Sequence, residues 1–510
     1  MYSTLITYIA LVTVMQFSFI LFYLGLFRVT QSLPTPFDPL PTSRNCTGKH
    51  IKQDEDHFTY PSKSQFNQRY FVCDQFFTRG GPIFFYTGNE ADITLFVNNT
   101  GFMWELGKSM GAFLVFAEHR GYGESITSIR GVNQVLSDYA HLIVNLFTSA
   151  EFRLPQSTPV ITFGSSYGGM LSGWMRIKYP HLVEGALASS APIFHMFGVN
   201  PSPDGTAFAS KVTQVAGTLC ASRLRRSLQV IENMTRYDAR KIRKILNLCG
   251  TPTDDEMTMW ANQPWGFLAM GNYPFPNNYI PITAGVGSNS LPAYPLTYAC
   301  AALTRSLDTS DEGLLESFKD SVQIWYNNTE TQRCFHVNKE RVGDQLFMSL
   351  RCSDIGGPYS QGTSKDAFAP RYSIDQHELD NMCRDDFGYP ARFQEGAIEF
   401  GMSKRDTVAA MTNIIWSNGE LDPWADYGVA CGEDGVRCHP SVVSPRIAEG
   451  AHSQDLLFSH PLDSDELTNV RRLESAHISS WIEAKLLRYA GVEPQNPFPI
   501  GELPNVILSQ

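Results

Sequence analysis

Short apolar runs alternate with stretches of helical spacing along the N-terminal part of the chain. The first three runs are β-prone and end in turn residues, and the stretches 101–111 and 170–178 repeat apolar positions with the spacing of a helix. Buried strands that alternate with helices predict a parallel sheet covered by helices on both faces. The predicted strands are 82–86, 112–117, 159–163, 182–188, 413–416 and 442–447, the last of which is interrupted by Pro445.

The pattern changes between residues 194 and 395. Amphipathic helical stretches dominate there, with Pro- and Gly-rich connections, and the predicted helices are 209–233, 238–248 and 313–326. Most of the cysteines also fall in this segment. We therefore predict a helical, disulfide-stapled insertion at 194–395 between two parts of one sheet domain, 35–193 and 396–490, followed by a C-terminal tail at 491–510.

The N-terminal segment is apolar and free of charge from about residue 5 to residue 27, and it ends at Arg28. It is longer than the core of an ordinary signal peptide and long enough to cross roughly 30 Å of hydrocarbon. A buried core helix is the less favoured alternative at an extreme terminus. Residues 1–34 are therefore predicted to be a secretory signal, either a cleaved signal peptide or a retained signal anchor.

The charge balance excludes two classes of partner. The chain has 510 residues and a formal net charge of −11, and its Lys and Arg residues form only short runs such as 240–244. Nucleic acids and anionic membrane surfaces are bound by clustered cations, so neither is expected as a partner. Membrane association is expected only if the N-terminal segment is retained.

The ten cysteines follow a predicted translocation signal, a context that favours disulfides. Zinc binding is the rival interpretation, but no two cysteines have the C-x₂₋₄-C spacing of a structural zinc site. No metal and no organic cofactor are expected. Glycosylation sequons, which become candidate surface glycan sites in the secretory pathway, occur at Asn45, Asn98, Asn233 and Asn327.

Residues 164–168 match G-x-S-x-G between a predicted strand and a predicted helix, with Ser166 at the centre. This context predicts a sharp turn that exposes a nucleophilic serine, with small flanking residues to leave room for it. The N–H of Tyr167, at the start of the helix, is the first expected donor to an oxyanion. The second is expected from Gly88 and Asn89, in the loop after an earlier strand.

A nucleophilic serine needs a histidine base and a carboxylate that orients it, in the chain order Ser, Asp or Glu, His. His452 follows the predicted last strand, and Asp422 follows the strand before it. Glu420 and Asp426 are alternative acids. His119 precedes the serine, so a structural hydrogen-bonding role is favoured for it over a site role. These patterns predict an α/β-hydrolase fold with Ser166, Asp422 and His452 as catalytic residues.

Three ordered strings resemble the prolyl serine exopeptidase family, which contains lysosomal Pro-X carboxypeptidase, dipeptidyl peptidase II and the thymus-specific serine protease. They are 84–90, 164–170 with 178–181, and 417–424 with 449–452, and further matches extend the resemblance over residues 50 to 490. The resemblance implies an α/β-hydrolase domain with a helical cap and hydrolysis at a proline. Ser166, Asp422 and His452 match the family's triad position by position.

The resemblance also implies the disulfides Cys220–Cys300, Cys249–Cys334 and Cys352–Cys383 in the cap. The four remaining cysteines are additional to the family pattern, and elimination pairs them as Cys46–Cys73 and Cys431–Cys438. The chain departs from the pattern after the histidine, at Ser453 and Gln454, after the acid, at 425–428, and in the cap at 346–349.

A pocket for a proline ring should be apolar and aromatic, because the ring has no N–H to bind. Met170 and Trp424 are the expected walls, with ordinary core packing as the alternative for each. Glu90, beside the predicted oxyanion loop, is a candidate for binding a free amine, with a solvated loop carboxylate as its alternative. The residues leave open whether the enzyme is a dipeptidyl peptidase or a carboxypeptidase.

We therefore predict a serine exopeptidase of the secretory pathway, lysosomal or extracellular, that acts on peptides with proline near a terminus. A homodimer is a possible assembly. A carboxylesterase or lipase on the same fold is one alternative, and an inactive adhesion or binding protein is another, because fold alone does not determine function.

Overall fold

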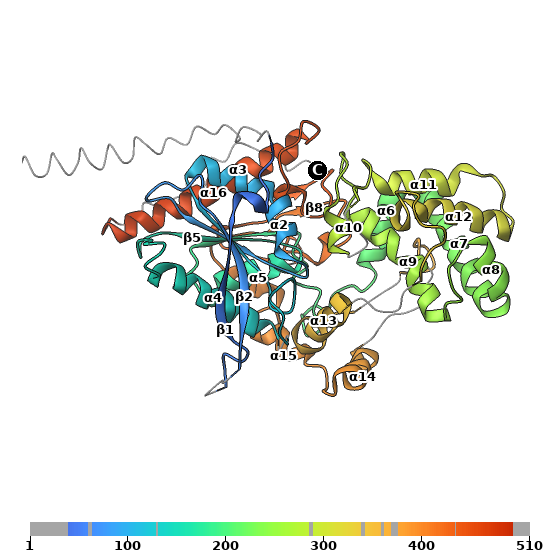
Figure 1. Cartoon of the computed structure of the whole chain (residues 1–510), viewed down its shortest axis with the longest axis horizontal. Helices are drawn as coiled ribbons and strands as arrows, with labels where there is room; N and C mark the ends of the chain where they lie inside the picture. Colours follow the sequence, from blue (N-terminus) through green and yellow to red (C-terminus); the bar gives the residue numbers. More distant parts are fainter. Residues whose placement is uncertain are drawn as a thin grey trace, which may run out of the picture. The chain divides into compact units, whose positions relative to one another are not determined.

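The computed structural model describes residues 39–59, 64–128, 131–284, 289–337, 342–358, 362–368, 376–433 and 435–492 (Figure 1). The predicted signal, residues 1–34, lies outside these ranges, as does the predicted tail from residue 493 onwards. None of the helices in the described ranges is both long and apolar enough to span a membrane.

The described strands form an eight-stranded sheet in the order β1-β2-β4-β3-β5-β6-β7-β9. The pairs β1–β2 and β2–β4 are antiparallel, and all other neighbours are parallel. The strands are β1 Thr47–Asp54, β2 Gln65–Cys73, β3 Ile83–Thr87, β4 Phe113–Ala117, β5 Val160–Ser165, β6 Gly185–Ser189, β7 Ile414–Ile415 and β9 Val442–Val443.

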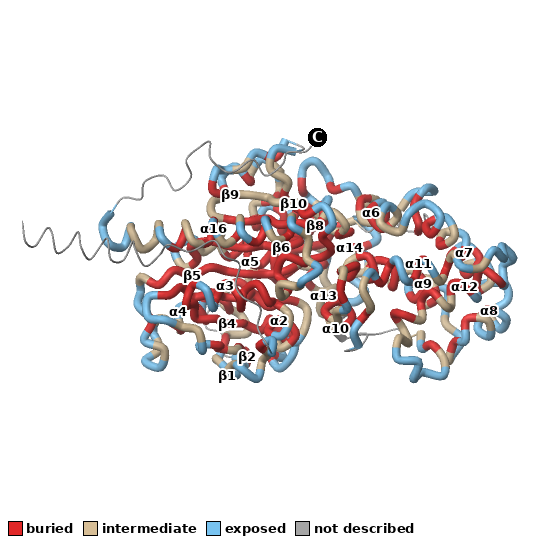
Figure 2. The backbone as a smooth tube through the Cα atoms, turned by 90° about the horizontal axis from the view of Figure 1, so that it is seen from above, coloured by how far each residue is buried: buried red, intermediate tan, exposed pale blue. Residues whose placement is uncertain are grey.

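The alternation of side chains along β3 explains why helices are needed on both faces of the sheet. Phe84 and Tyr86 pack in one apolar layer, which includes helices α2, α3 and α16. Ile83 and Phe85 pack in a second layer, which includes α4 and α5. Figure 2 shows the resulting band of buried backbone through the strands. The helices are α2 Ile93–Asn99, α3 Gly101–Met110, α4 Val132–Thr148, α5 Tyr167–Lys178 and α16 Asp465–Tyr489. The predicted α/β-hydrolase sheet covered on both faces is confirmed.

Two predicted strands are corrected by the structure. The strand predicted at 182–188 begins only at Gly185, because Leu182 and Val183 both donate their N–H groups to the carbonyl of Tyr179 in a turn. The strand predicted at 442–447 is two strands, since Pro445 between them has no N–H for a sheet ladder. Its second half, β10 Arg446–Ile447, pairs with β8 Asn418–Gly419 in a separate sheet.

Between β6 and β7 the described chain is mainly helical, and we call the segment α6–α15 the cap. Figure 1 shows α7, α8, α9, α11 and α12 gathered in one cluster. The helix predicted at 209–233 is broken at Gly217, which has a φ of 78° between α6 and α7. The cap helices are α6 Ala207–Ala216, α7 Thr218–Tyr237, α8 Ala239–Ile245, α9 Asp254–Met270, α10 Tyr279–Thr283, α11 Pro295–Arg305, α12 Asp311–Tyr326, α13 Val342–Leu350, α14 Gln376–Phe387 and α15 Phe393–Glu399.

All ten cysteines are paired in the structure, with the connectivity expected from the sequence. The bridges are Cys46–Cys73, Cys220–Cys300, Cys249–Cys334, Cys352–Cys383 and Cys431–Cys438. Five disulfides indicate that the chain folds in an oxidising compartment.

A buried pair of carboxyl groups lies behind the ends of β6 and β7. Asp455 accepts hydrogen bonds from the hydroxyls of Ser189 and Ser417, at 2.5 and 2.6 Å. Glu474 of α16 is fully buried beside it. Burial, and then the negative charge of Asp455, raise the pKa of Glu474 well above its usual value, while Arg471 opposes the rise. The folded protein therefore holds Glu474 as a neutral acid more strongly than the unfolded chain does.

This difference predicts a stability that falls as the pH rises. The contribution of Glu474 is complete below the usual pKa of 4.5 and is lost as the pH rises through the raised pKa of the folded state. We expect Glu474→Gln, which keeps the neutral shape, to raise the midpoint of thermal unfolding by about 2 °C or more at about pH 7.5 and not at about pH 4.5. Glu483→Gln, an exposed position on the same helix, is the matched control. An equal shift at both pH values would contradict the expectation.

Candidate active site

Ser166 lies at a sharp turn between β5 and α5. Its φ of 57° and ψ of −127° are unusual for a residue with a side chain, so the surroundings must hold the turn in place. A Cβ at Gly164 would lie 2.0 Å from the carbonyl oxygen of Gly168, and a Cβ at Gly168 would lie 2.8 Å from that of Thr87. The two glycines of the motif are therefore required by close backbone approach. The predicted strand–turn–helix context of Ser166 is confirmed.

The loop after β3 packs against the first turn of α5. Thr87 donates its hydroxyl to the carbonyl of Gly168 at 2.8 Å, and the buried Asn89 points its Oδ1 at the same glycine. Tyr167 is the first residue of α5, so its N–H has no acceptor within the helix. Across the described residues, no acceptor is found for the N–H of Tyr167 or of Asn89. Tyr167 directly follows Ser166, and Asn89 lies against Gly168, two residues after Ser166. A role of the two N–H groups as oxyanion donors stays a prediction.

Asp422 and His452 meet in the interior. Asp422 Oδ2 lies 2.7 Å from His452 Nδ1, and both side chains are almost wholly shielded from solvent. The N–H of Trp424 donates to the other oxygen of Asp422 at 3.0 Å, which fixes the carboxylate. Since Nδ1 faces Asp422, Nε2 is the ring nitrogen left to exchange a proton with another group.

The two alternative acids are engaged elsewhere. Glu420 pairs with Arg446 at 3.2 Å, and Asp426 lies 3.6 Å from Lys211. Both carboxylates are partly solvated, whereas Asp422 is fully buried. The structure thus brings Asp422 to the histidine and leaves the other two on the surface.

The end of β6 connects the serine turn to the histidine loop. The carbonyl of Ser189 accepts the N–H of Ser166 at 2.8 Å. The hydroxyl of the next residue, Ser190, accepts the N–H of Ser453 at 2.8 Å. The backbones of Ser166 and of Ser453, the residue after His452, are therefore held by two adjacent residues at the end of β6.

Glu90 follows the oxyanion loop and lies close to His452. Its Oε2 is buried and has no hydrogen-bond partner. Burial raises the pKa of Glu90, while contact with Asn89 and the charge of protonated His452 oppose the rise. A buried Oε2 without a partner does not fit the alternative of a solvated loop carboxylate, and the role of Glu90 in binding stays a prediction.

The two predicted wall residues differ in their surroundings. Met170 is 4% exposed and packs in the apolar layer of α5, so core packing accounts for its contacts. Trp424 is half-buried and makes edge contacts with His195 and Phe208, with ring centroids 5.2 and 4.8 Å away. Trp424, in the loop after β8, therefore belongs to an aromatic cluster with His195, in the segment after β6, and Phe208 of cap helix α6.

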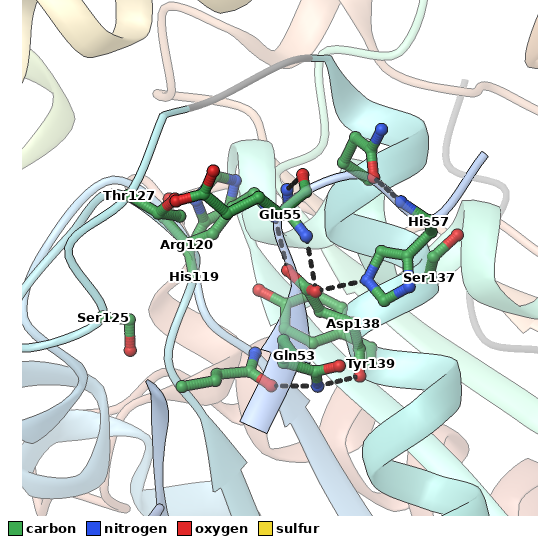
Figure 3. A network of polar contacts seen from close by, with 12 residues as sticks. Gln53, Glu55, His57, His119, Arg120, Ser125, Thr127, Ser137, Asp138 and Tyr139 are labelled. Atoms are coloured by element: carbon green, nitrogen blue, oxygen red, sulfur yellow. Dashed lines mark hydrogen bonds and ion pairs between the residues drawn. The ribbon is translucent and has the colours of Figure 1, made fainter. Parts of the chain in front are cut away.

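His119 has the structural role expected for it. Its Nδ1 lies 2.5 Å from the carbonyl of Arg120 and its Nε2 3.1 Å from the hydroxyl of Tyr167. Burial lowers the pKa of His119 to about 3, so the ring is neutral, with Nδ1 donating and Nε2 accepting. Figure 3 shows the network behind it, in which Arg120 binds Asp138 and Asp138 binds His57.

The cap supplies contacts that the sequence did not predict. The hydroxyl of Tyr279 lies 2.5 Å from Ser165 Oγ, directly before the central serine. Two further residues of the cap, Met270 and Tyr273, bind the backbone of His452. No motif in the sequence pointed to these residues. Two of the three hydrogen bonds, those to His452, involve backbone groups, which a pattern of side chains does not reveal.

Three of the four sequon asparagines, Asn45, Asn98 and Asn233, are exposed, and Asn327 is half-buried. Their glycosylation remains a prediction. Throughout the described ranges, no group of three or more His, Cys, Asp and Glu side chains is arranged to hold a metal ion.

Comparisons with known proteins agree with the resemblance of the motifs. The model of the family "Serine carboxypeptidase S28" matches residues 53–474. Lysosomal Pro-X carboxypeptidase of Mus musculus is 33% identical over 472 residues, covering 88% of this chain and 91% of that protein. The Homo sapiens protein of the same name is 33% identical, covering 89% and 92%. Thymus-specific serine protease of Mus musculus is 26% identical, covering 85% and 87%. With a family model that spans most of its length, the chain belongs to the serine carboxypeptidase S28 family of serine peptidases.

Proposed function

We propose that this protein is a serine exopeptidase of the Pro-X carboxypeptidase type, which releases the residue that follows a proline at the C-terminus of a peptide. The observation that carries the proposal is the buried hydrogen bond between Asp422 and His452, in a chain 33% identical over nearly its full length to lysosomal Pro-X carboxypeptidase. The same likeness favours a lysosomal location.

In the proposed mechanism, Ser166 Oγ attacks the scissile carbonyl and passes its proton to Nε2 of His452. Asp422 keeps the Nδ1 proton in place and stabilises the imidazolium that forms. The N–H groups of Tyr167 and Asn89 bind the oxyanion. His452 then gives its proton to the leaving amine, and water hydrolyses the acyl-enzyme by the reverse sequence.

Proline at the scissile position requires an apolar surface without donors that would go unpaired. The aromatic cluster of Trp424, His195 and Phe208 supplies such a surface. Burial lowers the pKa of His195 to about 3, so it is a neutral ring rather than a cation in this cluster. Met170 is not needed for this surface, because core packing already accounts for its contacts.

The specificity is tested with three substrates given to the purified protein. They are a peptide ending in Pro-Phe, a free-amine Xaa-Pro reporter and the N-blocked form of that reporter. We expect release of the terminal Phe and no cleavage of the blocked reporter. Cleavage of the free-amine reporter alone would contradict carboxypeptidase action, and cleavage of only a simple ester would contradict proline specificity altogether.

Replacing the nucleophile tests the chemistry. Ser166→Ala is expected to lower kcat by at least about 10⁴-fold and to abolish labelling by a fluorophosphonate, because it removes the hydroxyl that forms the acyl-enzyme in the proposed mechanism. Ser165→Ala is the matched control, since this neighbouring hydroxyl bonds to Tyr279 instead. Labelling that survives in Ser166→Ala would reject the assignment.

Dipeptidyl-peptidase action is a second candidate, favoured by the buried and unpartnered Oε2 of Glu90. A carboxylate there could accept a hydrogen bond from the free amine of a substrate. A charge-assisted bond of about 1.5–3 kcal/mol corresponds to roughly 10- to 100-fold in affinity.

If Glu90 binds a free amine, Glu90→Gln should raise KM for the free-amine Xaa-Pro reporter by roughly 10-fold or more, because the amide carries no charge. KM for the peptide ending in Pro-Phe should not change. Glu420→Gln, at a partly exposed carboxylate paired with Arg446, is the control. Equal KM values in Glu90→Gln and the unaltered protein would exclude this role.

A further inference from the structure

Both backbone polar groups of His452 are bound by one short segment of the cap. The N–H of His452 donates to the carbonyl of Met270 at 3.0 Å. The hydroxyl of Tyr273 donates to the carbonyl of His452 at 2.7 Å. A histidine at the centre of the site is thus held between the sheet domain, through Asp422, and the cap.

The bond to Met270 uses a group that a helix leaves free. Met270 is the last residue of α9, and the last carbonyls of a helix have no donor within it. The N–H of His452 therefore satisfies the C-terminus of a cap helix. Both partners are backbone groups, so the contact fixes the main chain at the histidine directly.

Tyr273 is itself held rigidly. It is 1% exposed, its carbonyl accepts the N–H of Tyr294 at 2.8 Å, and its neighbour Asn272 accepts the N–H of Leu296 at 3.2 Å. Leu296 belongs to α11, which the disulfide Cys220–Cys300 joins to α7. Burial, reinforced by nearby Tyr279 and Asp422, raises the pKa of Tyr273 well above its usual value, so the hydroxyl stays protonated and remains a donor.

The position of the histidine ring depends on its backbone. The Asp422 bond fixes only Nδ1, and the ring can still pivot about that contact if the main chain at 452 moves. The next residue, Ser453, has a φ of 53°, a left-handed conformation that is uncommon for a residue with a side chain. The cap contacts at residue 452 and the Ser190 contact at residue 453 support the main chain there.

We propose that Tyr273 is a positioning residue for His452, so that docking of the cap is a condition for forming the active base. The proposal rests on the proposed role of His452 as the base. In this proposal the cap positions the catalytic base, in addition to any role that it has in binding the peptide.

The test compares Tyr273→Phe with Tyr326→Phe. Both variants lose a cap tyrosine hydroxyl that donates to a backbone carbonyl at 2.7 Å, but the acceptor of Tyr326 is Trp260, inside the cap. We expect Tyr273→Phe to lower both kcat on the Pro-Phe peptide and the rate of fluorophosphonate labelling by about tenfold, with KM within twofold of the original value. Tyr326→Phe should change neither rate. The fluorophosphonate is small and does not occupy the peptide subsites, so its rate reports the serine and its base.

A rise in KM with unchanged labelling would mean that Tyr273 binds substrate, and would overturn the proposal. Equal rates in the two variants would overturn it as well. If Tyr273→Phe does not fold, as judged by thermal unfolding, Asn272→Ala serves instead. This substitution loosens the Tyr273 segment from α11 without touching His452, and a labelling rate equal to that of Tyr326→Phe would reject the proposal.

His452→Ala separates failure of this inference from failure of the proposed function. Labelling of His452→Ala at the original rate would reject the base assignment, whatever Tyr273→Phe does. Loss of labelling in His452→Ala, together with equal rates in the two tyrosine variants, would reject only the role of Tyr273.

Discussion

The turn at Ser166 is the constraint on which the rest of the site depends. A serine with a φ of 57° is held in a sparsely populated conformation, and the turn persists only because its neighbours leave no alternative. Gly164 and Gly168 allow the backbone to close, and the hydroxyl of Thr87 ties the β3 loop to α5. The loop that carries Asn89 is thereby brought beside the serine, and β6 receives the N–H of the serine itself.

His452 is also held in place by its neighbours, which come from separate parts of the chain. Asp422 binds its ring, Ser190 binds the residue after it, and the cap binds its main chain. Segments near residues 190, 270, 420 and 450 therefore converge on His452. Such a residue is positioned by the assembled fold rather than by its own loop, which is consistent with a cap that is stapled by disulfides.

Two networks of buried polar groups, one on each face of the sheet, lie next to the site. On the α4 side, the chain of contacts from His57 through Asp138 and Arg120 leads to His119, which meets Tyr167 (Figure 3). On the α16 side, Asp455 binds the serines at the ends of two strands, beside a neutral Glu474. The first network is built around ion pairs. The second is built around a buried carboxyl group, Glu474, whose pKa is raised well above its usual value by burial and by the charge of Asp455.

The sequence by itself determined most of the parallel strands, the serine turn and His452 with a short list of acids that included Asp422, because these depend on local patterns. Contiguous apolar runs mark doubly buried strands, and the motif with the chain order of the triad marks the site. It did not mark the two antiparallel strands β1 and β2, nor the break at Gly217. In β1, Lys, His and Gln occupy the strand positions and only Gln53 is buried. Only the tertiary structure decided that Tyr273 and Met270 bind His452. These contacts join residues about 180 positions apart, and on the His452 side both use backbone groups that every residue possesses. A local pattern of side chains therefore does not reveal them.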